Sequence, residues 1–181
     1  MHEKFERIYD HYHQMLFQYI FYMVRNREVA EELVQEVYIK VLHSYDEFKG
    51  ESSEKTWLYS IAKHVAVDWI RKQNRQKRRW LGKWFDVHER DFEVSDSEPL
   101  PEEIVIQRDE MKDVYKQLRR CRIDQQQVIV LRYLQGLSIN ETAEVLGWTE
   151  SKVKTTQHRA IQKLKKHLSD YDDQELKEVS R

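Results

Sequence analysis

Residues 138–168 read SINETAEVLGWTESKVKTTQHRAIQKLKKHL, and this stretch has the pattern of a helix-turn-helix motif. Such a motif needs a small residue where its two helices cross, a glycine in the turn, and an apolar residue that seats the second helix. Ala143, Gly147 and Val153 supply these three features in that order. The sequence therefore predicts two short helices that meet at Gly147.

The second helix of this motif, expected over about 150–168, divides into two different faces. At about 100° per residue, one face carries Val153, Ala160 and Leu164, which suits a core. The other face is polar and cationic, and no acid occurs from 151 to 169. An ordinary solvated face would mix both charges, whereas a major-groove helix needs hydrogen-bonding groups for base edges and cations for phosphates. The side chains predicted to bind DNA are Ser151, Lys152, Lys154, Thr155, His158, Arg159 and Lys163.

Helical periodicity extends over most of the remaining chain. In the N-terminal part, apolar residues recur at helical spacing over 5–23, 30–42 and 57–69. Upstream of the motif, helices are expected over about 102–119 and from Asp124, which with Gln127 resembles a capping box, to about 136. The residues between these groups, 81–101, are acidic and contain both prolines. We therefore predict an all-α chain with these parts: a domain over 1–80, an acidic flexible linker over 81–101, a second domain over 102–170 and an acidic tail over 171–181.

A second basic cluster lies in the third expected helix. From Arg71 to Lys83 there are seven Lys or Arg and no acid. Trp57, Tyr59 and Trp69 precede this cluster and would offer stacking surfaces to unpaired bases. Trp57 and Trp69 also lie on the apolar stripe, so packing in the core is the stronger interpretation for these two.

The composition excludes several classes of protein. With 31 Lys and Arg against 32 Asp and Glu, the net charge by itself indicates no partner. Four scattered glycines cannot form a Gly-rich phosphate loop, and the single cysteine, Cys121, excludes a disulfide framework. The longest uncharged run, from Gln14 to Val24, is shorter than the ~20 residues of a membrane span. We therefore expect a cytoplasmic protein without membrane insertion.

Three ordered segments carry a resemblance to a known family. They are AEELVQEVY at 30–38, FKG at 48–50 followed by TWLYSIAKH at 56–64, and the region from 123 to 164 that contains the helix-turn-helix. At these segments the chain resembles the extracytoplasmic-function (ECF, group IV) sigma factors of bacterial RNA polymerase, within the sigma-70 family. The resemblance implies a sigma region 2 domain and a sigma region 4 domain, and it covers about 5–170.

The resemblance also implies a function and its residues. A sigma factor binds core polymerase, recognises the −35 and −10 promoter elements and directs initiation of transcription. The helix-turn-helix of region 4 would read the −35 element. In the −10 region, His64 stands where the family often has Asn. The residues expected to bind the core enzyme are Glu32, Leu33, Gln35 and Glu36, although Leu33 also lies on the apolar stripe. Those expected to bind or melt the −10 element are Ser53, Trp57, Tyr59, Lys63, His64, Arg71 and Lys72.

The implied partners are core RNA polymerase, through its β′ clamp and β flap, promoter DNA and an anti-sigma factor. A second hypothesis is an autonomous helix-turn-helix regulator whose N-terminal domain dimerises, and a third is a helical adaptor whose basic faces are incidental. We expect no catalytic residue, because acid pairs such as Glu31 and Glu32 lack apolar surroundings that would raise a pKa. No cofactor or metal site is expected either, since the histidines lack ligand partners at suitable spacing.

Overall fold

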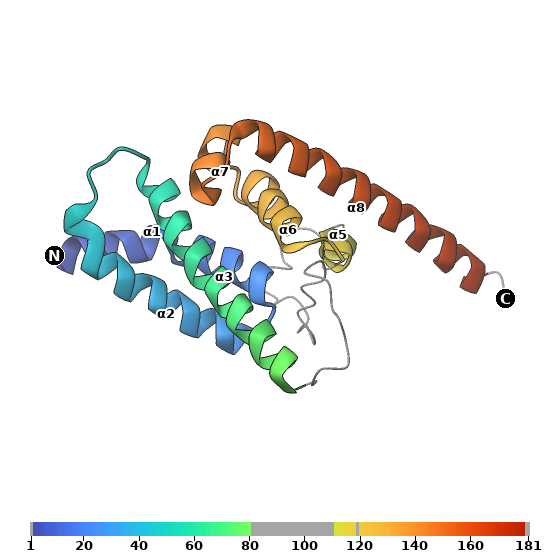
Figure 1. Cartoon of the computed structure of the whole chain (residues 1–181), viewed down its shortest axis with the longest axis horizontal. Helices are drawn as coiled ribbons and strands as arrows, with labels where there is room; N and C mark the ends of the chain where they lie inside the picture. Colours follow the sequence, from blue (N-terminus) through green and yellow to red (C-terminus); the bar gives the residue numbers. More distant parts are fainter. Residues whose placement is uncertain (1, 81–110, 119, 180–181) are drawn as a thin grey trace.

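The computed structural model describes residues 2–80, 111–118 and 120–179, and the regular structure in these ranges is helical (Figure 1). This confirms the predicted all-α class. The predicted linker, 81–101, lies outside the described residues. Among the residues that are described, no helix has both the length and the apolar content that a bilayer crossing requires.

Three helices form the first domain: α1 (His2–Val24), α2 (Arg27–Ser44) and α3 (Glu54–Trp80), with a short 3-10 turn, η1 (Tyr45–Glu47), after α2. Each helix packs on the other two, and their apolar stripes form the shared core, as the periodicity predicts. Both later helices are capped at their start. The Asn26 side chain accepts from the Val29 N–H (2.8 Å), and the Ser53 hydroxyl accepts from the Thr56 N–H (3.0 Å).

An ion pair joins the start of α3 to α1. The guanidinium of Arg7 donates two hydrogen bonds to the Glu54 carboxylate, at 2.6 and 3.0 Å, and the Tyr45 hydroxyl donates a third at 3.1 Å. Partial burial raises the pKa of Glu54, but the hydrogen bonds from Arg7 and Tyr45 outweigh it, so the pKa lies below its ordinary value. The carboxylate therefore stays charged at neutral pH and holds the two helices together.

The second domain contains α5 (Met111–Leu118), α6 (Ile123–Ile129), a π-helical turn η3 (Val130–Leu134), α7 (Ile139–Leu146) and α8 (Glu150–Val179). The cap of α6 differs from the prediction, because Gln125, and not Gln127, closes it: the Arg122 N–H donates to the Gln125 side chain at 3.1 Å. The side chain of Gln127 is buried instead. Helix α8 is also longer than expected, since no Gly or Pro follows Gly147 to end it near 168.

The helix-turn-helix forms as predicted. Ser138 and Glu141 make a reciprocal capping box at the start of α7, with hydrogen bonds of 2.7 and 3.1 Å. Gly147 ends α7 with φ of +67°, a left-handed conformation that glycine adopts without a side-chain clash. The Thr149 hydroxyl then accepts from the Lys152 N–H at 3.2 Å and caps α8. Val153 is fully buried, so the second helix is seated where the pattern places it.

Candidate nucleic-acid and polymerase interfaces

The outer face of α8 is open to solvent. Two contacts organise its first turns: the Lys152 ammonium lies 4.0 Å from the Trp148 ring centroid, and Lys154 pairs with Glu150 at 3.3 Å. Sequence reasoning missed both partners, although the spacing of four residues between Glu150 and Lys154 is a signal for such a pair. The structure exposes six of the seven predicted residues here, namely Ser151, Lys152, Lys154, Thr155, His158 and Arg159.

Lys163 departs from this face. Its side chain is half-buried, and its charge acts on the buried thiol of Cys121 in the domain core. Burial raises the pKa of that thiol, which keeps it in the neutral form. Lys163 is thus less exposed than the other six residues, and its role at the DNA-facing row stays a prediction.

A side chain from η3 fixes the rotation of α8. Arg132 donates to the Gln157 amide oxygen at 3.1 Å, and also to the Leu137 carbonyl. Because Gln157 lies on the inner side of α8, this bond keeps Thr155 and His158 pointing outward. Contacts within the second domain therefore determine which side of α8 points to solvent.

The middle of α3 carries a second cationic surface. The Nδ1–H of His64 donates to the Ser60 carbonyl at 2.7 Å, because a carbonyl can only accept, and Nε2 lies 3.3 Å from the Lys63 ammonium. Burial and the nearby charge of Arg71 lower the pKa of Lys63. Asp68 pairs with Arg71 at 3.8 Å, as expected for residues three apart on a helix. Lys72 is exposed on the next turn.

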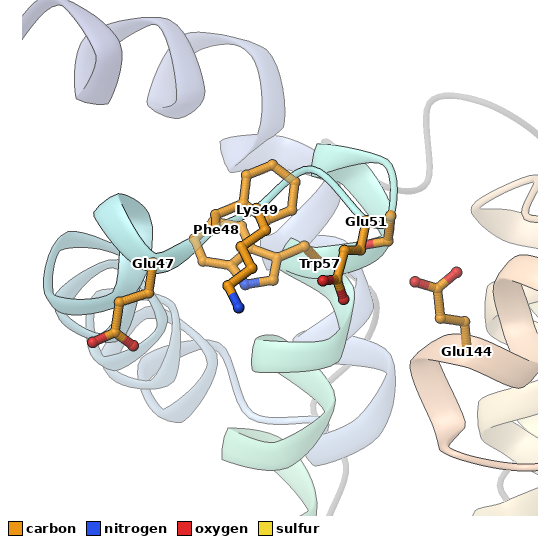
Figure 2. Close-up of a pocket in the computed structure, with 7 residues that line it drawn as sticks. Glu47, Phe48, Lys49, Glu51, Trp57 and Glu144 are labelled. Carbon is orange, nitrogen blue, oxygen red and sulfur yellow. The ribbon is translucent and has the colours of Figure 1, made fainter.

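Trp57 forms the wall of a pocket at the start of α3. Its ring lies 4.8 Å from Phe48 and 5.9 Å from Tyr45, between ring centroids. The pocket has a volume of about 370 Å³ and opens beside the loop that precedes α3 (Figure 2). Trp57 is half-buried, so one side packs on the core and the other lines the pocket. The residues that line it are Glu47, Phe48, Lys49, Glu51, Ser52, Trp57 and Glu144.

Two predicted site residues are buried. Tyr59 is 1% exposed, packs edge-on against Tyr19, and donates from its hydroxyl to the Gln135 side chain at 2.6 Å. Leu33 is 6% exposed in the core of the first domain. Neither side chain is presented to a partner in this arrangement, which corrects the prediction for both. Ser53 is exposed, but its hydroxyl caps α3.

The outer face of α2 has an acidic part and an apolar part. Glu32, Gln35 and Glu36 are exposed, as predicted. One turn further along the same face, Ile39 is 55% exposed, which sequence reasoning did not single out. Leu42 is 43% exposed, which corrects its place on the apolar stripe expected over 30–42. Apolar side chains exposed next to each other on one helix are a feature of binding surfaces.

A groove of about 480 Å³ between α1 and α2 adjoins this face. The His13 ring lies 4.5 Å from Tyr9 and 6.0 Å from Tyr38 in stacked geometry, and Phe17 and Val34 complete the apolar part of the lining. Burial lowers the pKa of His13, so the imidazole in this stack is neutral at neutral pH. In the part of the chain that the structure describes, no group of His, Cys, Asp or Glu side chains is placed to hold a metal ion.

Two small helical domains, one of them a helix-turn-helix domain, define the class of protein. Residues 8–76 match the family model for Sigma-70 region 2, and residues 124–166 match that for Sigma-70, region 4. Among solved structures, the fold is similar to the sigma factor RpoE in complex with the anti-sigma factor NepR from Bartonella quintana, with a TM-score of 0.71 and 22% identity over 92% of this chain and 98% of that one. It is also similar to CnrH in complex with the cytosolic domain of CnrY, with a TM-score of 0.68 and 19% identity over 94% of this chain and 90% of that one.

Sequence relatives narrow the class to one group. The chain is 52% identical over 168 residues to the ECF RNA polymerase sigma factor SigX of Bacillus subtilis, which covers 93% of this chain and 85% of that protein. It is 33% identical over 180 residues to the RNA polymerase sigma factor YlaC of the same organism, over 96% of each chain. The chain belongs to the ECF sigma factors of the sigma-70 family. Segments 13–24 and 151–158 resemble sigma-X of Bacillus-like bacteria, and the first of these identities confirms that resemblance.

The family decides between the hypotheses on function. A sigma factor directs RNA polymerase to promoters, and this role is supported over that of an autonomous helix-turn-helix regulator. The same findings leave no support for an adaptor with incidental basic faces, because most of α3 and the first half of α8, which carry these faces, lie within the matched regions.

Proposed function

We propose that this sigma factor uses three separate surfaces: α2 for core polymerase, α8 for the −35 element, and the α3 face with the Trp57 pocket for the −10 element. The observation that supports this most directly is the presence of an open face on α8, with no acid from 151 to 169, together with a second cationic face in the other domain. The chain itself is not an enzyme in this proposal, and it acts in the cytoplasm, where RNA polymerase transcribes.

The polymerase surface consists of the exposed side of α2 and the adjoining groove. Glu32 and Glu36 supply negative charge, and Ile39 and Leu42 supply apolar area beside it. A basic or polar helix of the β′ clamp would meet the acids, while the apolar pair would be desolvated at the centre of the contact. The β flap would contact the second domain.

At the −35 element, α8 enters the major groove. Lys154, Thr155 and His158 would contact base edges, because they project from the middle of the exposed face. Lys152 and Arg159 lie beside that row and would hold phosphates. The contact of Lys152 with the Trp148 ring limits where its ammonium can reach.

At the −10 element, the target is DNA whose bases must become unpaired. The rings of Phe48 and Trp57 meet at 4.8 Å and line a pocket with room for a flat aromatic group. Lys63, His64 and Lys72 follow along α3 and would track the backbone of the separated strand.

An anti-sigma factor is a further partner in this proposal. The similar RpoE structure contains the anti-sigma factor NepR. In this chain, an inhibitor would be most effective on the α2 face and the α3 face, since covering them would block polymerase and DNA together.

The test is run-off transcription with purified core polymerase, with and without this protein. Glu32→Lys combined with Glu36→Lys should abolish both the transcript and co-purification with core polymerase, because it reverses the charge of the proposed contact. The matched control is Asp10→Lys with Asp46→Lys, two exposed acids outside the α2 face, which should keep both activities. Unchanged co-purification of the Glu32/Glu36 variant would contradict the assignment of α2. No transcript from any form of the protein would contradict the sigma role itself.

A further inference from the structure

An acidic side chain lies at the start of the helix proposed to read the −35 element. Glu150 is the first residue of α8, and 49% of its side-chain surface is exposed. It directly precedes the run from 151 to 169, which contains no acid. In helix-turn-helix proteins, the N-terminal residues of the recognition helix contact base edges. A carboxylate at this position therefore comes close to DNA, although the phosphates repel it.

The turn before α8 fixes the position of Glu150. The Thr149 hydroxyl accepts from the Lys152 N–H at 3.2 Å, and the Thr149 carbonyl accepts from the Val153 N–H at 3.1 Å. The Val153 side chain is fully buried, so both the start of α8 and its rotation about its axis are determined within one turn of Glu150. The direction in which the Glu150 side chain leaves the helix therefore follows from the fold of the second domain.

Glu150 begins a row of side chains along the exposed face. Residues four apart are neighbours on a helix surface, so Glu150, Lys154 and His158 follow one another along α8. The Lys154 ammonium donates to Glu150 Oε2 at 3.3 Å, and the Asn140 side-chain amide, at the start of α7, donates to Oε1 at 3.5 Å. A carboxylate accepts about four hydrogen bonds and an ammonium donates three. After these contacts, the Glu150–Lys154 pair still has an acceptor and a donor side by side.

The major groove contains few partners for a carboxylate. The hydrogen-bond donors of its base edges are the amino groups of cytosine N4 and adenine N6, while the other polar groups there are acceptors. Acidic side chains accept from cytosine N4, and lysine donates to guanine O6 and N7. These two bases form one base pair, in which the donor and the acceptors lie next to each other. The Glu150–Lys154 pair therefore has the hydrogen-bonding pattern that complements a G·C pair.

We propose that Glu150 is a specificity-determining residue of the −35 contact, where its carboxylate accepts from a cytosine amino group while the Lys154 ammonium donates to the paired guanine. The inference rests on the proposed function, because it concerns the same face of α8. Thymine or guanine in place of the cytosine leaves the carboxylate facing acceptors, which costs binding free energy. Adenine there supplies a donor, but its thymine partner has one acceptor for Lys154 where guanine has two.

A purely structural role for Glu150 has a different consequence. An acid in the first turn interacts favourably with the helix dipole, and its pairing with Lys154 supports the start of α8. If these were its only contributions, loss of the carboxylate would change binding to all sequences alike. Loss of a base contact instead changes the preference at one base pair, so base preference is the quantity to measure.

The test is selection of DNA by the holoenzyme formed from core RNA polymerase and the full chain. The probe is a library of duplexes with a randomised segment long enough for both promoter elements, and the bound fraction is sequenced. At one position of the −35 motif, the wild type should enrich cytosine about tenfold over guanine and thymine. Glu150→Ala should lose this enrichment and keep those at the other positions. It should also bind duplexes without the motif about two- to fivefold more tightly, because one charge that repels phosphates is removed.

Two further variants separate base reading from helix support. Glutamine binds adenine through N6 and N7, so Glu150→Gln should shift the preference at the same position from cytosine to adenine. Glu150→Lys with Lys154→Glu keeps an acid and a base four residues apart, but it should lose the cytosine enrichment. The matched control, Glu28→Gln, changes an exposed glutamate in the first turn of α2 and should leave all base preferences unchanged. Thermal unfolding checks that each variant is folded.

The outcomes distinguish this inference from the proposed function. The same −35 motif in the wild type and in every Glu150 variant would overturn the inference and leave the role of α8 intact. A uniform loss of binding in Glu150→Ala, or a change at a position where the wild type prefers a base other than cytosine, would also overturn it. Absence of any −35 motif in the wild-type selection would contradict the proposed role of α8 itself, and this inference with it.

Discussion

The two helices that we propose to face DNA, α3 and α8, differ in whether the same residues serve both the core and the binding surface. On α8 the outward residues, such as Thr155 and His158, are exposed, and the core is made by a separate set on the opposite face. On α3 the tasks overlap, because Trp57 packs on the core and lines a pocket, while Tyr59 is buried against the other domain. On a helix at the surface of its domain, the residues that contact DNA can differ from those that form the core. On a helix that is packed on several sides, some residues must serve both purposes.

The largest effect that would test this difference is expected from Trp57→Ala. Because one side of the ring packs on the core, the substitution should lower the free energy of unfolding of the first domain by about 2–4 kcal/mol. It should also weaken binding of single-stranded DNA, because the ring lines the pocket proposed to receive an unpaired base. Thermal unfolding and fluorescence anisotropy measure the two effects. A variant that melts like the wild type but loses strand binding would show that Trp57 acts only as a stacking surface.

On α8 the two effects should be separate. Thr155→Ala and His158→Ala should each reduce discrimination at particular base pairs of the −35 element by about 1–3 kcal/mol. The free energy of unfolding should change by less than about 0.5 kcal/mol, because both side chains are exposed. A series of promoter variants, read by transcription, measures the first quantity, and urea unfolding measures the second.

Arg159→Ala provides the contrast within α8. It should weaken binding to all sequences alike and reduce the slope of log affinity against log salt by about 1, as expected for one lost phosphate contact. If Arg159→Ala changes base preference while Thr155→Ala lowers affinity uniformly, α8 is rotated in the groove relative to the proposed orientation.

A smaller effect is expected where α7 begins. Ser138→Ala removes the acceptor of the Glu141 N–H and should lower the free energy of unfolding of the second domain by about 1 kcal/mol. Since α7 both supports α8 and packs on α3, −35 affinity at room temperature should hold while the melting temperature falls. Asn140→Ala, at the exposed second residue of α7, is the control and should melt almost like the wild type, because it removes only an exposed hydrogen bond of 3.5 Å to Glu150. A similar loss in both variants would mean that the capping box contributes nothing specific.

The smallest effect concerns the ion pair of Glu54 with Arg7. The pKa of Glu54 is lowered in the folded protein, so its contribution to stability is present above the ordinary Glu pKa of about 4.3. That contribution is lost as the pH falls through the lowered pKa. Urea unfolding of wild type and Glu54→Gln should therefore differ at pH 6 to 7 and converge in acid. A constant difference at all pH values would show that the charge of Glu54 is not the cause.

The sequence by itself determined the elements of the second domain that depend on near neighbours. The Ser138 and Glu141 pair, the glycine at 147 and the spacing of Val153 and Ala160 all act within one or two helical turns. Interactions of this range are encoded by residues three to seven positions apart, so the helix-turn-helix and the open face of α8 could be predicted. The sigma-70 resemblance added the roles of α2 and α3, which charge and periodicity would not have assigned.

Only the tertiary structure decided which of the predicted side chains on these helices are exposed to a binding partner. Tyr59 is buried by Gln135, which lies 76 positions away, and Glu144 reaches the pocket of Trp57 from the other domain. Lys163 is half-buried, whereas the other residues predicted on that face of α8 are exposed. Helical periodicity tells which side of a helix a residue occupies but not which other helix packs there. Contacts between distant segments depend on how whole helices pack, and that is why the packing of the two domains against each other could not be read from the pattern of either one.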